Sequence, residues 1–461
     1  MTRDMTDGSP LARILAFCAP LLVGNLFQQF YNLADSILVG RILGVKAFAA
    51  VGSTGALSFL ILGFALGICS GFTIPLAQAF GAGDRDRLRD YTGQLIWLGL
   101  AFTALITALT FFFTDEILRI TRTPEEIFDE AYRYIFIVFM GTGAAILYNL
   151  SSAVLRALGD SRTPLYFLMG AVTLNVLLDL LLMKGLGCGV EGAAWATVFS
   201  QLAAGLACLV YIRARVPVLH LGAENLRLKR RCLEKLLFMG VPMGLQFSIT
   251  AVGSIILQSA VNGLGAAAVA AVSAGSRVHN IVVAPLETCG IAMATYCGQN
   301  LGAGKIDRIR QGLWITTAAA VVYCGLAYLV NRFAGRAIAL LFLDAAETGI
   351  LNQTQRYLMT MSLAYPLLAL VFIFRNGLQG MGFSVEAMSA GLSELAARSL
   401  VAFGFVGKLG FRAVCFANPT AWLFADVVLL TLYHLEMRRL SVAPEELRCR
   451  RQHRKLLRAK G

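Results

Sequence analysis

The sequence from Ala19 to Gly52 reads APLLVGNLFQQFYNLADSILVGRILGVKAFAAVG. From residue 14 to residue 40 the chain is apolar enough, and long enough, to cross a bilayer as a helix. Pro20 removes a helix hydrogen bond and favours a kink. Asp35 places a carboxylate at membrane depth, which costs at least about 2.5 kcal/mol on insertion scales. A transported cation or a proton is the first candidate for the group that offsets this cost.

The rest of the chain has the same apolar character. Of its 461 residues 57% are hydrophobic and 15% charged, with a mean hydropathy of +0.69, whereas a soluble protein carries about 25% charged residues. Apolar runs of roughly 20 residues recur from end to end. They predict an all-α polytopic membrane protein with twelve transmembrane helices. The expected spans are 14–40, 48–79, 92–113, 132–155, 164–183, 192–213, 236–262, 276–299, 311–331, 353–379, 384–407 and 413–436.

The two halves of the sequence resemble each other. Pro20 is matched by Pro242, and the Gly-Ala-Gly motif at 81–83 is matched at nearly the same offset by the Gly-Ala-Gly motif at 302–304. We interpret both glycine motifs as turns. Six spans per half predict two pseudo-symmetric lobes of the same orientation, with a substrate cavity between them. The expected domains are an N-terminal six-helix lobe (1–213), a cytoplasmic basic linker (214–235), a C-terminal six-helix lobe (236–437) and a basic cytoplasmic tail (438–461).

The basic residues indicate topology rather than nucleic-acid binding. The net charge is +13, and Lys and Arg are concentrated in 213–235 and 438–460. By the positive-inside rule both termini of a multi-pass protein of the cell membrane are expected in the cytoplasm. The ten cysteines are scattered and form no C-x-x-C motif, so we expect neither a disulfide framework nor a metal site from them. A Walker A motif and a catalytic constellation are also missing from the sequence, which argues against an ATPase or another enzyme.

Polar residues inside the first-half spans form the candidate ion site. Asn175 and Asp179 are four residues apart and share one face of a helix. With Asp35 and Thr197 they form an oxygen-rich set that suits a monovalent cation or a shared proton, with Asn149 as a neighbouring polar group. Two carboxylates that meet in low dielectric are expected to bind at least one proton near neutral pH. The alternative is that each Asp caps a helix or pairs with a buried Arg, but the two spans that carry them contain no Arg or Lys.

The second half does not repeat this site. The positions that match Asp35 and Asp179 are apolar, namely Ile256 or Leu257 and Val401 or Ala402. The second half has Glu287, Glu394 and Arg398 instead. Because Glu394 and Arg398 are four residues apart on one helix, we interpret them as an ion pair, with a role in the substrate path as the alternative.

Several of these residues carry a resemblance to a known family. The carriers are the Pro20 to Asp35 spacing, Val-Gly-Arg-Ile-Leu-Gly at 39–44, Ala-Ala-Val-Gly at 49–52, Arg-Ala-Leu-Gly-Asp at 156–160, Asn175-x-x-x-Asp179, Thr197 and Gly-Val-Pro at 240–242. Together they resemble the multidrug and toxic compound extrusion (MATE) family, and most of all its DinF-type branch. The resemblance covers nearly the whole chain.

The resemblance implies twelve helices in two lobes that form a V, and antiport of a drug against Na⁺ or H⁺. It implies a cation site at Asp35, Asn175, Asp179 and Thr197, and a helix that bends at Pro20 during transport. Span seven offers only Gln246, Gln258 and Asn262 where some branches have an acid, which argues against an ion site in the second lobe. We expect small-molecule substrates, organic cations above all, and a monomer in the lipid bilayer. No nucleic-acid partner is expected, and no cofactor or metal beyond the coupling ion.

A flippase for a lipid-linked oligosaccharide or peptidoglycan precursor, from the same superfamily, is the alternative. Such a protein needs several Arg or Lys side chains in its central cavity to hold a pyrophosphate. Arg398 is well inside a span, whereas Arg156 and Arg375 are close to the expected helix ends. The sequence therefore favours the drug antiporter.

Overall fold

A computed structural model describes residues 4–120, 123–340 and 347–458, with residues 441–458 as backbone alone. The described chain is helical and contains no β-strand. The first half contains α1 (Pro10–Leu43), α2 (Val45–Ser53), α3 (Gly55–Phe72), α4 (Ile74–Gly81), α5 (Arg85–Ile120), α6 (Glu125–Met140), α7 (Thr142–Ala157), α8 (Arg162–Asp179), the π-helix η1 (Leu180–Gly185) and α9 (Gly189–Arg215). The second half contains α10 (Arg230–Asn262), α11 (Ala266–Gly302), α12 (Ile306–Phe333), α13 (Gly335–Ala339), α14 (Thr348–Leu363), α15 (Tyr365–Met381), α16 (Ser384–Gly404), α17 (Val406–Leu409) and α18 (Phe411–Arg458).

Twelve membrane crossings account for these helices. In the described chain nine helical segments are long and apolar enough to cross a bilayer, and eleven if each of two bent pairs is one span. We assign the twelfth crossing to α16, which has 21 residues but carries Glu386, Glu394 and Arg398. These charges lower its hydropathy and so hide it from a composition test.

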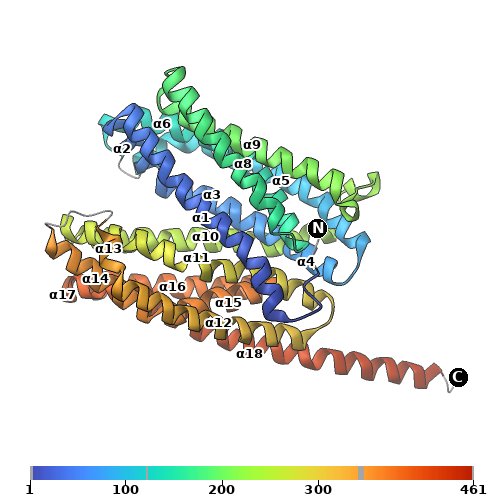
Figure 1. Ribbon diagram of the computed structural model, residues 1–461. Coiled ribbons are helices and arrows are strands. Elements are labelled where there is room, and N and C mark those ends of the chain that lie inside the picture. Colours follow the sequence, from blue (N-terminus) through green and yellow to red (C-terminus); the bar gives the residue numbers. More distant parts are fainter. Residues whose placement is uncertain (1–3, 121–122, 341–346, 459–461) are drawn as a thin grey trace.

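The helices form two groups that follow the two halves of the sequence (Figure 1). The N- and C-termini lie at the same end of the array, on the right of the view, together with α4; α2, α13 and α17 lie at the opposite end. Many Leu, Val and Phe side chains are exposed on the outer faces of both groups. Such faces suit contact with lipid acyl chains rather than with water.

The internal repeat of the sequence is also a repeat of structure. The bent pairs α6–α7 and α14–α15 break at Gly141 and Ala364, which are equivalent positions of the two halves, and bend by 46° and 51°. The glycines of the paired turns have matching left-handed backbones, with φ of 68° at Gly83 and 70° at Gly304. Only glycine adopts this conformation without strain, so the expected turns at both motifs are confirmed.

The two lobes are joined at the end that carries the termini. There α3 packs on α10, and α4 packs on α11. A Cβ atom on Gly81 would overlap the Gln299 carbonyl, and one on Gly302 would overlap the Gln78 carbonyl. Gln78 Nε2 donates to the Gly380 carbonyl at 3.1 Å, and Gln299 Nε2 donates to the Ala157 carbonyl at 2.8 Å. The first glycine of each motif therefore permits a close backbone contact with the other lobe, and the two contacts are equivalent. We call this pair of contacts the seal between the lobes.

Helix α1 contacts both lobes, on either side of Pro20. Ile14, Phe17 and Cys18 are buried in the core of the second lobe. Farther along the same helix, Val39 is buried in the first lobe against α2, η1 and α9. Pro20 lies inside the continuous helix between these two contacts. A bend at Pro20 would therefore move the segment that carries Asp35 relative to the second lobe.

The segments at the joined end are held by polar contacts. The Lys305 ammonium donates to Asp7 Oδ1 at 2.6 Å and lowers the pKa of that carboxyl, so the contact is ionic at neutral pH. Helix α10 begins at Arg230, inside the expected linker 214–235. The remaining linker packs on α5, where Lys229 and Asn225 both donate to Asp90. The expected tail 438–461 continues as part of α18 to Arg458.

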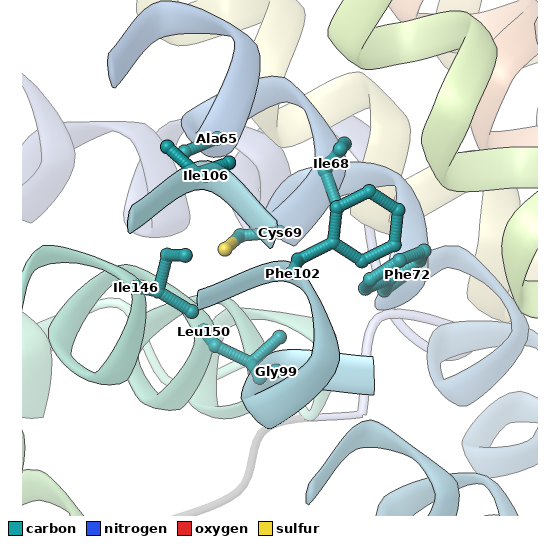
Figure 2. A pocket seen from close by; sticks show the side chains of 9 residues that line it. All are labelled: Ala65, Ile68, Cys69, Phe72, Gly99, Phe102, Ile106, Ile146 and Leu150. Atoms are coloured by element: carbon teal, nitrogen blue, oxygen red, sulfur yellow. The ribbon is translucent and has the colours of Figure 1, made fainter. Parts of the chain in front are cut away.

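Inside the first lobe a small pocket is lined by nine residues of α3, α5 and α7, including Ala65, Phe72 and Ile146 (Figure 2). Its lining is apolar and its volume is about 10 Å³. A space of this size holds at most one water molecule, and an apolar space stays dry. We interpret it as a packing defect, and the substrate site must lie elsewhere.

Candidate functional site

The structure brings together Asp35 of α1 and Asp179 of α8, which are far apart in the sequence. Their carboxyl groups lie close together and interact directly. Asp179 is fully buried, and the Oδ1 atoms of both residues are buried without a hydrogen-bond partner in the described chain. No described Lys, Arg or His forms an ion pair with either carboxyl. Two unneutralised carboxylates repel at this distance unless a proton or a cation is shared between them.

Asn175 holds Asp179 from one turn earlier on α8. In the amide orientation that gives both of its polar atoms a partner, its nitrogen donates to Asp179 Oδ2 at 2.8 Å. Its oxygen then accepts from the Tyr31 hydroxyl at 3.3 Å and from the Thr197 backbone N–H at 3.1 Å. The Thr197 hydroxyl lies 3.3 Å from the Tyr31 hydroxyl. The four expected site residues Asp35, Asn175, Asp179 and Thr197 thus converge from three helices, with Tyr31 as a fifth member.

The backbone around Asp179 is unusual. Asp179 is the last residue of α8, and the chain passes directly into the π-helical turn Leu180–Gly185. Short π-helical turns are rare and occur often at functional sites, because the wider turn re-aims side chains and frees backbone carbonyls. The turn begins inside the expected span 164–183, where no residue pattern indicates it.

The carboxyl pair lies beside a large cavity between the lobes. This cavity has a volume of about 630 Å³, which is in the range of small-molecule sites. Tyr31 and Asn175 belong both to its wall and to the carboxyl site. Pro20 also lines it, as does Asn149, whose amide donates to the Ala145 carbonyl of its own helix at 2.9 Å. Asn149 therefore lies on the cavity wall, apart from the carboxyl pair.

The charged residues of the second lobe form a different arrangement. Glu394 of α16 is buried between two guanidinium groups: it accepts from Arg398 at 3.2 Å and pairs with Arg375 of α15. The expected Glu394–Arg398 ion pair is confirmed, and Arg375 extends it. Asp426 of α18 is buried nearby, with neither carboxyl oxygen hydrogen bonded within the described chain.

Arg156 and Arg375, which were expected close to helix ends, have different positions in the structure. Both line the cavity, and Arg375 is buried in the interior of α15. Arg156 lies in the last turn of α7, as expected, and the end of this helix contacts Gln299 of the second lobe. The cavity is therefore more basic than the sequence predicts. Glu394 neutralises Arg375. Arg156 is therefore the cationic residue of the cavity wall that forms no ion pair with a described carboxylate. A flippase would need more than one such residue.

A family model described as MatE matches residues 20–181 and 242–401, which is most of both lobes. The chain belongs to the MATE family. The probable multidrug resistance protein YoeA of Bacillus subtilis is 32% identical over 359 residues, 76% of this chain and 77% of the relative. The probable multidrug resistance protein YpnP of the same organism is 29% identical over 385 residues, 84% of this chain and 86% of the relative.

Solved MATE-type structures share the fold. A MOP superfamily transporter from Pyrococcus furiosus superimposes with a TM-score of 0.88 at 22% identity, over 95% of this chain and 98% of the other. The expected fold, an all-helical membrane transporter of the MATE type, is confirmed. The assignment to the DinF-type branch stays a prediction.

Two residues were not predicted from the sequence, namely Tyr31 of the carboxyl site and Asp426 beside the charged cluster of the second lobe. Tyr31 precedes Asp35 by four residues, so the i, i+4 spacing that linked Asn175 to Asp179 could have found it. Asp426 gave no such signal, because its neighbours Arg375 and Glu394 lie on other helices.

Proposed function

We propose that this protein exports small organic molecules in exchange for protons or Na⁺, by alternating access of the cavity between the lobes. The observation that carries the proposal is the carboxyl pair: Asp35 and Asp179 meet in the first lobe without a cationic side chain in the described chain. A carboxylate that is permanently paired to Arg has no need of a mobile ion, whereas an unpaired one must bind a proton or a cation when it is buried. The oxygens of Thr197 and Tyr31 complete a set that suits either ion.

A shared proton suits the close approach of the two carboxyls, because a hydrogen bond between two carboxyl groups requires that one of them carries a proton. Coordination of Na⁺ by oxygens of both carboxyls is the alternative.

Helix α1 supplies the link between the ion and the substrate. Its first part is packed in the second lobe and its later part carries Asp35 into the first lobe. A change of charge at Asp35 alters the contacts of the later part of α1. Bending at Pro20 can then transmit this change to the interface between the lobes. Because Tyr31 and Pro20 both line the cavity, the same bend changes the cavity wall.

The substrates are expected to include organic cations, for which Glu287 provides a carboxylate on the cavity wall. Uptake of the fluorescent cation rhodamine 123 into everted membrane vesicles tests the transport function. We expect uptake when a proton gradient is imposed in the absence of Na⁺, and no uptake by Asp179→Asn. Uptake that needs only a Na⁺ gradient would assign Na⁺ as the coupling ion, and uptake that follows neither gradient would contradict the proposal.

The proposed orientation places both termini, the turn at 81–90 and the linker at 213–235 in the cytoplasm of the cell, with the sealed end inward. Glu224 is exposed in the linker. A Glu224→Cys substitution in a cysteine-free background should react with a membrane-impermeant maleimide only after the cells are opened. Labelling in intact cells would invert the orientation.

A further inference from the structure

One face of α7 presents a line of polar side chains to the cavity. Tyr148, Ser152 and Arg156 follow at intervals of four residues, so they lie above one another along the helix. All three line the cavity. The Ser152 hydroxyl accepts from Arg156 Nη1 at 2.6 Å, and Tyr148 is one turn away from Ser152 on the same face. The hydrogen bond to Ser152 orients the guanidinium group of Arg156 before any ligand binds.

The remaining donors of Arg156 are free. Among the described residues, Nε and Nη2 make no hydrogen bond, and no carboxylate lies within ion-pair distance of the guanidinium. Glu287 is the single acidic side chain in the described wall of the cavity, and it is not paired to Arg156. A guanidinium group in such an enclosed place is costly without an anion.

In the second lobe the corresponding polar residues of α15 are all paired with other protein groups. On α15, the helix equivalent to α7, Arg375 is neutralised by Glu394. Gln379 takes the position equivalent to Arg156, by the offset that also aligns Gly159 with Gly382. Its amide donates to Gln246 at 2.6 Å. The guanidinium of Arg375 and the amide of Gln379 thus each have a protein partner. Arg156 differs from its counterpart by keeping its binding capacity open to the cavity.

We propose that Arg156 forms an oxyanion-binding subsite, which takes a carboxylate or a phosphate group of the transported molecule. A guanidinium fork binds such groups through two parallel hydrogen bonds, more strongly than a neutral donor does. The cavity wall also offers aromatic side chains at Tyr31, Phe59, Phe247 and Phe372. The substrates that fit are aromatic molecules with an anionic group at one end, including zwitterions whose cationic end faces Glu287.

This inference rests on the proposed function in one respect, namely that the cavity is the substrate site. A matched pair of dyes tests it: rhodamine 110 has a free carboxylate, and rhodamine 123 is its methyl ester. Binding of both to the purified protein in detergent is measured by fluorescence polarisation. We expect the wild type to bind rhodamine 110 more tightly than the ester, and Arg156→Gln to bind it about tenfold or more weakly, which is the worth of a hydrogen bond to a charged group.

Binding of rhodamine 123 should change little in Arg156→Gln, and Arg156→Lys should keep part of the preference because it keeps the charge but not the fork. Arg213→Gln removes an equal charge from the exposed end of α9 and should leave both affinities unchanged. A wild type without preference for the free acid contradicts the subsite, as does an Arg156→Gln protein that keeps the preference.

The two proposals fail in different ways. If the dyes bind equally but affinity still responds to pH or Na⁺, the subsite is wrong and the antiport stands. If the free acid is preferred through Arg156 but its affinity responds to neither ion, the subsite stands and the antiport is wrong.

Discussion

The two lobes share a fold but surround Asp179 of the first and Glu394 of the second with different partners. In the first lobe Asp35 and Asp179 contact each other, with a polar shell of Asn175, Tyr31 and Thr197 and no described cation. In the second lobe Glu394 is held between two arginines. The equivalents of the two aspartates there, among them Leu257 and Val401, are buried apolar residues.

This difference separates a site that needs a mobile ion from one that supplies its own counter-ion. Glu394 has its counter-ions within the protein, at Arg375 and Arg398, so it does not depend on a mobile ion for its neutralisation. A carboxyl pair without a cation changes its charge whenever the ion binds or leaves. We therefore propose that the two similar scaffolds differ in function, with the coupling chemistry in the first lobe.

The largest expected effect comes from breaking the second-lobe cluster. Glu394→Gln leaves two buried guanidinium groups without their shared carboxylate, and we expect a loss of about 3–5 kcal/mol in stability. Thermal unfolding of the purified protein should show a clear fall in Tm. Asp35→Asn is the matched control, since it leaves no cation unpaired and should unfold near the wild-type temperature. The reverse ranking would mean that Asp35 is the structural carboxylate.

The second effect compares the prolines of equivalent helices. Pro20→Ala should fold and insert normally but transport rhodamine 123 several-fold more slowly, because α1 links the ion site to the second lobe through this residue. Pro242 lies in the equivalent helix α10 of the second lobe, where apolar residues replace Asp35 and Asp179. Pro242→Ala should therefore transport rhodamine 123 at a rate closer to that of the wild type. The rate is measured in vesicles with matched protein content. Equal rates for Pro20→Ala and the wild type would remove the proposed role of the bend.

The smallest effect compares two amides. Asn175→Ala removes a hydrogen bond to a carboxyl group, worth about 1.5–3 kcal/mol when that group is charged, and should shift the pH at which dye affinity changes. Asn149→Ala removes only a bond to its own helix carbonyl and should change dye binding by about 0.5 kcal/mol or less. Titration of dye affinity against pH distinguishes them. If this pH shifted in Asn149→Ala and not in Asn175→Ala, the ion site would lie near Asn149 instead of Asn175.

Much of this architecture could be predicted from the sequence, because a membrane span is defined by local composition and a duplication by a fixed offset. The convergence of Asp35 with Asp179 was also predictable, since two buried acids without local cations must find each other or an ion. The contacts of Arg375 and Arg156 were not predictable in this way. Whether a residue near a helix end faces the membrane surface or an internal cavity depends on where the lobes meet, and that contact joins residues such as Gly81 and Gln299 that are far apart in sequence.

We propose that the carboxyl pair Asp35–Asp179 couples ion binding to substrate binding. Coupling between two sites is reciprocal, so the ion must change the equilibrium affinity for the substrate. The direct test is rhodamine 123 affinity of the wild type, Asp35→Asn and Asp179→Asn in detergent, as the pH is lowered and, separately, as Na⁺ is raised. We expect the wild-type affinity to fall with one of the two ions and neither mutant to respond. A wild-type affinity that responds to neither ion, or mutants that respond as the wild type does, would contradict it.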